Sequence, residues 1–280
     1  MNLLKYIGSK DQLLPVINKY IPSNIDTIVE PFCGSASVSL SQGKSYYLSD
    51  SSPELINFLE CVRDYPVATI VAIRELNNKY LSLDDSLKKD FYMELRYEDR
   101  KDGFSLNNNR LRAARYYFII YHGFNGLYRV NQKGQCNTTF GGNVRKLPTD
   151  WEDRIKSSSK HIVENCKGIL YQQFDNTGYL QSLIDSTEDV SKIFVFIDPP
   201  YHDTFDMYTK EGTRFDFWDR LLTYLEDLDK AGIAFLMTNS YNDFILDKFS
   251  KFKVDKVSVK YTVSADGNRP TTFESFITNK

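Results

Sequence analysis

A carboxylate, two prolines and an aromatic ring follow a continuous apolar run in the stretch FVFIDPPY, residues 194–201. The Asp198 carboxylate and the Pro199 carbonyl could each accept one N–H of an amino group on a flat ring, because proline fixes the backbone that carries the carbonyl. Two such acceptors favour a more tetrahedral nitrogen and direct its lone pair at an electrophile, while Tyr201 could stack on the ring. An adenine in a duplex would have to leave the helix to reach this site. Asp198, Pro199, Pro200 and Tyr201 therefore indicate activation of one aromatic amine; a tight turn with a capping aspartate is the alternative.

A loop of small residues follows the short β-rich run Thr27–Val29. Gly34, Ser35 and Ala36 allow the backbone to approach a ligand, and the helix expected after them presents free N–H groups. Asp50 ends another short strand roughly twenty residues downstream, a spacing at which an acid commonly binds both ribose hydroxyls of an adenosine-containing ligand. Loop and acid together predict such a ligand; a purely structural turn is the alternative for the loop alone.

The middle of the chain is basic although the whole chain carries a net charge of -2. Residues 103–149 contain no Asp or Glu. The basic residues of this window are Arg110, Arg112, Arg115, Arg129, Lys133, Arg145 and Lys146. Tyr, Phe and Asn side chains interleave with them, which suits base stacking and hydrogen bonds to base edges. A basic module within an acidic framework predicts contact with a polyanion.

Strands alternate with helices in both flanking parts of the chain. Residues 192–198 form an unbroken apolar run, which is typical of parallel strands that are buried on both faces. Ser52 and Pro53 are a predicted helix start, and residues 217–232 show helical spacing that ends at Gly232. This alternation predicts an α/β fold with a doubly wound, mostly parallel sheet, whose ligands bind at the carboxyl ends of the strands.

The composition excludes several other classes of protein. The four cysteines are far apart without a C-x-x-C pair, which favours reduced thiols over disulfides or a zinc site, and the three histidines are equally scattered. The amino-terminal apolar run is too short for a signal peptide, and no apolar stretch approaches the roughly 20 residues that span a bilayer. We therefore expect a cytoplasmic protein without a metal or a membrane contact.

In these motifs the chain resembles the Dam-type DNA N6-adenine methyltransferases of bacteria and phages. The stretches that carry the resemblance are, in order, LKYIGSKDQLL, VEPFCGSASVSL, YLSD, FNGLYRVNQKGQCNTTFG and IDPPY. They span nearly the whole chain, and together they are specific although each alone is not. The resemblance implies a Rossmann-like methyltransferase fold, S-adenosyl-L-methionine as cofactor, and methylation of adenine N6 in double-stranded DNA at the sequence GATC.

The resemblance also assigns a cofactor site and a DNA-binding surface. The implied cofactor residues are Tyr6, Gly8, Lys10, Glu30, Pro31, Phe32, Cys33, Gly34, Ser35, Ala36, Ser37, Asp50, Gln173, Phe174 and Asp198. The implied DNA-binding residues are Arg96, Phe124, Asn125, Leu127, Arg129, Asn131, Lys133, Asn137 and Thr139. Among these, Arg129 would bind guanine, Phe124 and Asn125 would insert into the duplex, and Asp198 to Tyr201 would hold the flipped adenine. An equal alternative for Arg96 is a surface ion pair.

The resemblance further implies a division into domains. We expect a catalytic domain at residues 1–58 and 166–280 and an inserted, mainly helical DNA-recognition domain with a β-hairpin at residues 59–165. The chain departs from many relatives at Ala36, where they have glycine, and at Gln173, where they have aspartate. Arg269 and Glu274 are reminiscent of a closing family motif, and their roles do not follow from the sequence.

The expected reaction is direct in-line methyl transfer without a covalent enzyme intermediate or a metal, by a monomer or a weak dimer on DNA. Two alternatives remain open at the level of sequence. One is an amino methyltransferase that acts on cytosine N4, RNA or a protein amide. The other is a catalytically silent DNA-binding protein on this scaffold.

Overall fold

The computed structural model describes residues 3–6, 8–104, 109–143, 145–172, 189–202, 214–260 and 271–279. The chain divides into two compact units. Unit 1 comprises residues 1–11, 34–43 and 50–171, and unit 2 comprises residues 12–33, 44–49 and 172–280.

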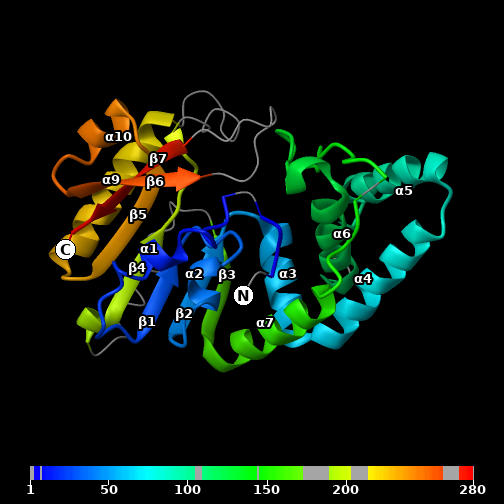
Figure 1. Ribbon diagram of the computed structural model, residues 1–280, viewed down its shortest axis with the longest axis horizontal. Helices are drawn as coiled ribbons and strands as arrows, with labels where there is room; N and C mark the ends of the chain where they lie inside the picture. The colour runs from blue at the N-terminus through cyan, green and yellow to red at the C-terminus, as the bar shows by residue number, and fades with distance from the viewer. Residues whose placement is uncertain are drawn as a thin grey trace. The chain divides into compact units, whose positions relative to one another are not determined.

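The strands form one seven-stranded sheet in the order β3-β2-β1-β4-β5-β7-β6 (Figure 1). They are β1 Thr27–Glu30, β2 Ser45–Asp50, β3 Cys166–Tyr171, β4 Ile193–Ile197, β5 Ala234–Ser240, β6 Lys253–Lys260 and β7 Thr271–Thr278. The pairs β1·β2, β1·β4 and β4·β5 are parallel, whereas β5·β7 and β6·β7 are antiparallel. This arrangement confirms the predicted α/β class with a mostly parallel sheet.

The most buried strand is the one that the apolar run predicted. All five residues of β4 are buried, because β4 has β1 on one side and β5 on the other. Val195 and Ile197 pack in one core cluster with Phe235 and Met237 of β5 and with side chains of the following helix, including Trp218. Asp198 therefore comes directly after a strand that is fixed by two neighbouring strands and a dense core.

Helices make up most of unit 1 and cover the core of unit 2. They are α1 Leu14–Ile17, α2 Ser37–Leu40, α3 Pro53–Asp64, α4 Pro66–Leu81, α5 Asp85–Tyr97, η1 Glu98–Arg100, α6 Asn109–His122, η3 Phe124–Gly126, α7 Trp151–Asn165, η4 Val190–Lys192, α9 Arg214–Lys230 and α10 Asp243–Lys248. The predicted start of α3 is confirmed, because the Ser52 hydroxyl accepts the Leu55 N–H at 3.4 Å and Pro53 is the first helical residue. Gly232 follows α9 with φ +73°, the left-handed conformation that favours glycine after a helix.

The helical core of unit 1 is aromatic. Tyr80 of α4, Phe91 of α5 and Phe118 of α6 pack in one buried cluster, and the Tyr80 and Phe118 rings meet edge to face at 5.4 Å. Ten consecutive residues of α6, Ala113–His122, are buried. A helix buried on all faces is a rigid support, and the chain leaves it directly into the segment with the predicted DNA-reading residues. Among the helices of the described ranges, none has the length and apolarity needed to cross a bilayer.

Candidate functional site

Residues 198–202, here called the catalytic strand end, are held by hydrogen bonds from β5. The Thr238 hydroxyl donates to Asp198 Oδ1 at 2.6 Å, and Thr238 is fully buried. At the other end of the segment, the His202 N–H donates to Asn239 Oδ1 at 3.0 Å. Two consecutive residues of β5 therefore fix the first and the last residue of the catalytic strand end.

The His202 side chain is also fixed. Its ring stacks on Phe244 of α10 with centroids 4.1 Å apart and planes at 13°, and its Nδ1 lies 3.3 Å from the Asn242 amide nitrogen. The Asn242 side chain in turn caps α10 by accepting the Ile245 N–H at 2.9 Å. His202 was not among the predicted site residues, and its contacts in the structure hold the end of the segment in place.

The end of β1 lies at the same edge of the sheet as the catalytic strand end, because β1 and β4 are parallel neighbours. Glu30 and Pro31 are buried there, and the Phe32 ring meets Phe217 of α9 edge to face at 6.3 Å. The Cys33 N–H donates to the Ser49 carbonyl at 2.9 Å, which joins the ends of β1 and β2. Four residues predicted for the cofactor site thus occupy a strand end where α/β proteins bind ligands.

Residues 34–37, here called the cofactor loop, form a tight turn in unit 1. Gly34 has φ +47°, and a Cβ there would lie 3.1 Å from the Tyr6 ring. The absence of a Cβ therefore allows this ring to lie close to the backbone of the loop. Ala36 is fully buried with φ +54°, a left-handed conformation that costs a residue with a Cβ about 1–2 kcal/mol. The departure at Ala36 therefore occurs at a position whose backbone favours the glycine of the relatives.

The opening segment of the chain lies against the cofactor loop. The Lys10 N–H donates to the Ser37 hydroxyl at 3.2 Å, and the Ser35 hydroxyl donates to the Ser9 hydroxyl at 3.2 Å. The Lys10 ammonium donates a hydrogen bond to the Gly8 carbonyl at 3.1 Å. The structure thus brings predicted residues from the start of the chain to the loop and adds Ser9 to them.

Asp50 ties the end of β2 to the cofactor loop. Its Oδ2 accepts the Gly34 N–H at 3.1 Å, and its Oδ1 accepts the Ser52 N–H at 2.9 Å. Burial raises the pKa of the Asp50 carboxyl, and these N–H donors oppose the rise because they stabilise the charged form. The Ser51 N–H is a third backbone donor to this carboxylate, and the part of Asp50 in binding a ribose diol stays a prediction. Gln173 and Phe174 lie outside the described residues.

Residues 127–139, here called the recognition hairpin, form a short irregular turn beyond α6. Its antiparallel pairing is limited to an isolated bridge between Val130 and Cys136, with a second bridge between Gly123 and Phe140 at its base. Asn131 builds the turn, because its Oδ1 accepts the N–H groups of residues 133 and 135 at 2.9 and 3.1 Å. Its proposed part in reading DNA stays a prediction, and its carbonyl oxygen serves the turn in this structure.

Most other predicted DNA-binding side chains near the hairpin are accessible. Phe124 is 51% exposed. The exposed polar residues among them are Arg129, Lys133, Asn137 and Thr139. Asn125 has φ +56°, which asparagine tolerates better than most residues. The Arg129 backbone is fixed on both sides, since its N–H donates to the Thr138 hydroxyl and its carbonyl accepts the Asn137 N–H, both at 2.9 Å.

A family model matches residues 6–263, and its description is D12 class N6 adenine-specific DNA methyltransferase. The chain belongs to this family. It is an adenine-specific DNA methyltransferase that acts on adenine N6, and the family implies a Rossmann-like methyltransferase fold, S-adenosylmethionine as methyl donor and DNA as substrate.

Relatives match over nearly the whole chain. The type II methyltransferase M.MjaIII of Methanocaldococcus jannaschii is 31% identical over 95% of this chain and 93% of its own. The type II methyltransferase M1.LlaDCHI of Lactococcus lactis is 28% identical over 98% and 94%. The DNA adenine methylase of Escherichia coli strain K12 is 26% identical over 94% and 89%. Similarity therefore extends across both units of the methyltransferase.

Two arginines of the basic window are not surface charges, contrary to the sequence-based expectation. Arg115 is 1% exposed and donates to the Leu95 and Arg96 carbonyls at 2.6 and 2.8 Å, at the end of α5. Arg112 forms a largely buried ion pair with Glu54 at 2.6 Å. Both side chains have structural partners, so the basic surface of the methyltransferase is smaller than the window predicted.

Arg115 also supports the recognition hairpin. Its guanidinium donates to the Tyr128 hydroxyl at 3.1 Å and pairs with Asp99 at 3.1 Å. Asp99 Oδ2 then accepts the Cys136 N–H at 2.5 Å. Arg96, which was predicted to contact DNA, donates to the Thr138 carbonyl at 3.2 Å, so in this structure it too holds the hairpin.

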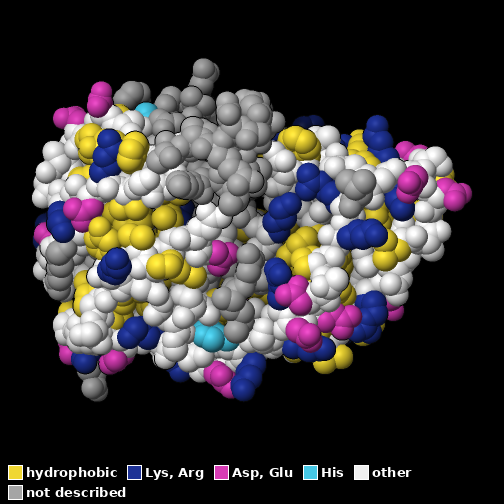
Figure 2. Space-filling model, viewed as in Figure 1, with side chains coloured by type: hydrophobic (Ala, Val, Ile, Leu, Met, Phe, Trp, Pro, Cys, Tyr) yellow, Lys and Arg dark blue, Asp and Glu magenta, His cyan; other side chains and the backbone are white. Residues whose placement is uncertain are grey.

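Two further cations lie near the base of the hairpin: Lys5, which the sequence patterns did not single out, and Arg145, which belongs to the basic window. The Lys5 side chain lies over Gly126, where a Cβ would meet its methylene carbons at 3.1–3.2 Å. Burial lowers the pKa of the Lys5 ammonium, and the cation of Arg145 lowers it further. The Arg145 guanidinium donates to the Gly141 carbonyl at 3.0 Å. Figure 2 shows that Lys and Arg side chains, in dark blue, are frequent over helices α3 to α6 on this face.

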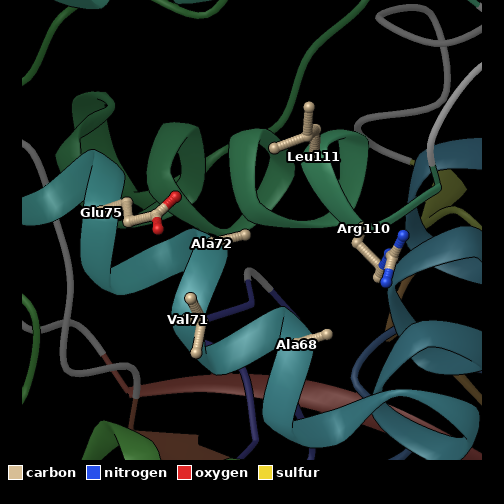
Figure 3. A pocket seen from close by; sticks show the side chains of 6 residues that line it. All are labelled: Ala68, Val71, Ala72, Glu75, Arg110 and Leu111. Carbon is tan, nitrogen blue, oxygen red and sulfur yellow. The ribbon is translucent and has the colours of Figure 1, made fainter.

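A shallow groove of about 370 Å³ lies between α4 and α6 (Figure 3). Its lining residues are Ala68, Val71, Ala72, Glu75, Arg110 and Leu111. The Arg110 guanidinium lies 5.8 Å from the centroid of the Tyr65 ring. The groove has none of the residues predicted for catalysis, for cofactor binding or for the hairpin, so we assign it no part in methyl transfer.

Glu274 is buried on β7 opposite Ser240 of β5, and Arg269 lies outside the described residues.

Proposed function

We propose that this methyltransferase transfers a methyl group from S-adenosylmethionine to N6 of an adenine that is flipped out of double-stranded DNA within the sequence GATC. The observation that carries the proposal is the fixed Asp198 carboxylate at the end of a fully buried strand. Its Oδ1 accepts a hydrogen bond from the Thr238 hydroxyl at 2.6 Å. An acceptor in a fixed orientation is what a weakly nucleophilic aromatic amine requires.

In the proposed reaction the catalytic strand end orients the adenine. Asp198 accepts one N6–H, the Pro199 carbonyl accepts the other, and Tyr201 stacks on the base. When bound, S-adenosylmethionine supplies a methyl group on a positively charged sulfur, so the N6–C bond forms as the S–C bond breaks. Asp198 stabilises the positive charge that develops on N6, and the N6 proton then leaves to solvent.

Three features of unit 1 support the proposed cofactor site. The absence of a Cβ at Gly34 lets the Tyr6 ring lie close to the turn, and the Asp50 carboxylate is held beside the turn by the Gly34 N–H. The segment with Tyr6, Gly8 and Lys10 lies against the cofactor loop through Lys10 and Ser9. We assign these residues to cofactor binding, together with residues 30–33 at the end of β1.

The exposed side chains of the recognition hairpin support DNA binding. In the proposal, Arg129 binds guanine O6 and N7, Leu127 and Asn131 help to read the site, and Phe124 and Asn125 enter the duplex. Lys133, Asn137 and Thr139 contact phosphates, and Lys5 and Arg145 add to the positive charge. Arg96 contributes to this surface indirectly, by its hydrogen bond to the Thr138 carbonyl of the hairpin.

We further propose that residues 59–165 are a DNA-recognition domain, that residues 1–58 and 166–280 are the catalytic domain, and that the enzyme acts as a monomer or a weak dimer on DNA. The aromatic helical core that ends at the recognition hairpin supports the first assignment. Sedimentation with and without a duplex measures the oligomeric state.

The Asp198→Ala variant tests the catalytic assignment. We expect it to bind S-adenosylmethionine normally in calorimetry and to lose at least about a thousandfold in the rate of methyl transfer to duplex DNA, because the amine loses its charged acceptor. Asp247→Ala is the matched control, since this carboxylate is exposed on α10. Normal turnover by Asp198→Ala would refute the assigned role.

The Arg129→Ala variant tests the proposed recognition of GATC. Sequencing of methylated adenines in DNA from expressing cells should show GATC for the unaltered enzyme. For the variant we expect relaxed choice at one guanine position, equivalent to about 1–3 kcal/mol of discrimination. Lys133→Ala is the matched control, because loss of a phosphate contact weakens all sequences alike. Equal loss on all sequences with Arg129→Ala would contradict the assignment, and methylation at another sequence would exclude GATC.

A further inference from the structure

The carboxylate of Asp198 is oriented by a residue outside the motif. Thr238 is on β5, the parallel neighbour of β4, and its hydroxyl donates to Asp198 Oδ1 at 2.6 Å. Thr238 has no exposed surface, and in the antiparallel pairing of β5 with β7 it lies opposite Phe276, which is also fully buried. A donor at this position has a fixed backbone and little space for another rotamer.

We propose that Thr238 is a positioning residue for methyl transfer, which acts by setting the plane of the Asp198 carboxylate. This inference rests on the proposed role of Asp198. A carboxylate can rotate about its bond to Cβ, and a hydrogen bond to Oδ1 fixes this rotation and hence the direction of both oxygens. The amine acceptor is then oriented before substrate binds, which removes an entropic cost from the reaction.

The neighbouring residue Asn239 supports this reading, because it performs the corresponding task for the backbone. Its Oδ1 accepts the His202 N–H at 3.0 Å and the Ser240 N–H at 3.0 Å. Asn239 thus fixes where the segment 198–202 ends, while Thr238 fixes the side chain with which it begins. Only the contact of Thr238 reaches a group that the proposed reaction uses directly, so Thr238 has the sharper test.

Two substitutions at Thr238 separate its hydroxyl from the rest of the side chain, and a third substitution elsewhere is the control. Thr238→Val keeps the shape and removes the donor, whereas Thr238→Ser keeps the donor and removes a methyl group. Thr69→Val is the matched control, because Thr69 is also fully buried and its hydroxyl donates to a backbone carbonyl, that of Cys61, at 3.3 Å. The measurement is the single-turnover rate of methyl transfer at saturating duplex DNA and S-adenosylmethionine, with dissociation constants for both measured separately.

We expect Thr238→Val to lower the single-turnover rate about 10- to 100-fold, since a hydrogen bond to a charged group is lost. Both dissociation constants should change less than about threefold, because the hydroxyl contacts neither DNA nor cofactor in the proposal. Thr238→Ser should recover most of the rate, and Thr69→Val should leave it unchanged. A normal rate for Thr238→Val would overturn the inference, and so would a loss confined to binding. If Thr238→Val does not fold, Thr238→Ser and Thr238→Ala form the decisive pair, and equal rates for these two would overturn the inference.

The same experiment separates this inference from the proposed function. Normal turnover by Asp198→Ala would remove both. Loss of turnover by Asp198→Ala together with a normal rate for Thr238→Val would remove only the role of Thr238. A double variant, Asp198→Ala with Thr238→Val, should be no slower than Asp198→Ala alone, because alanine leaves no side-chain acceptor for Thr238 to orient. A further loss of rate in the double variant would show that Thr238 acts in another way.

Discussion

The catalytic strand end, residues 198–202, and the recognition hairpin, residues 127–139, are both irregular segments, but different forces hold them. The first continues from β4, which is paired on both sides and buried along its whole length. The second has a single bridge of its own, between Val130 and Cys136, and depends on side chains that reach it from α5, η1 and α6. Arg115 is the centre of that support.

The two segments differ in the number of contacts that stabilise them. Around the catalytic strand end, many ladder hydrogen bonds and apolar contacts each contribute a little, so a small change at one position is tolerated. At the hairpin, one guanidinium satisfies two helix-end carbonyls, a tyrosine hydroxyl and a buried carboxylate. A change at Arg115 therefore leaves several buried polar groups without their partner, which is costly.

The largest effect on stability should come from Arg115→Met. We expect this variant to lower the free energy of unfolding by about 3–5 kcal/mol, because the buried Asp99 carboxylate loses its counter-charge. Urea unfolding measures the change. Arg74→Met is the matched control, since Arg74 forms an exposed ion pair with Glu152, and it should cost less than about 1 kcal/mol. Similar costs for both variants would show that the hairpin does not depend on Arg115.

The next effect concerns pH and His122, which precedes the base of the hairpin. Burial, together with the smaller effects of the Arg145 and Lys88 cations, lowers the pKa of His122 to about 4. Its ring packs against Phe118 and Tyr80, with centroid distances of 4.1 and 4.4 Å. The unfolded chain, with a histidine pKa of about 6.5, then binds more protons than the folded protein between these two values.

His122 should therefore contribute a loss of stability as the pH falls from about 6.5 to about 4, in total roughly 3 kcal/mol, and no further change below that range. Unfolding free energies at pH 7, 5.5 and 4, compared between the protein and His122→Gln, measure this contribution as a difference in slope. His161→Gln is the control, because that histidine is only partly buried. Parallel pH curves for the protein and His122→Gln would contradict the prediction.

The smallest effect should come from a change beneath the catalytic strand end. Ile197→Val removes one methylene group from the last residue of β4, and we expect a cost of about 0.5–1.5 kcal/mol with methyl transfer preserved, because two neighbouring strands hold the backbone. Thermal unfolding and the single-turnover rate measure the two parts. A cost above about 3 kcal/mol, or a large loss of rate, would show that this segment is as dependent on one side chain as the hairpin.

Local sequence patterns were sufficient for β4, for the start of α3 and for the position of two predicted site residues at strand ends. The apolar run at residues 192–198 predicted β4, and Ser52 with Pro53 predicted the start of α3. Both features depend on neighbours in the chain: a continuous apolar run must be buried, and a cap acts on the next few residues. Asp50 and Asp198 lie at strand ends as expected, whereas the roles assigned to them and to Tyr201 stay predictions.

Contacts between distant residues could not be predicted from those patterns. A basic residue in a window without acids looks like a surface charge, yet Arg115 finds Asp99 and the end of α5 only after α5 and α6 pack. The sequence did not reveal that Asn131, a predicted DNA-reading residue, also builds the turn through its Oδ1. Thr238 is 40 residues from Asp198, and no local spacing connects them.

By itself, the sequence determined which strands are buried, which residues follow them, and which family the chain resembles, because burial, capping and motif order depend on neighbours along the chain. Only the tertiary structure decided which polar groups meet. A buried hydrogen bond needs a partner of the right kind at about 3 Å, and strand pairing and helix packing select that partner from the whole chain. The support of the Asp198 carboxylate by Thr238 and that of the hairpin by Arg115 are both decided at that level.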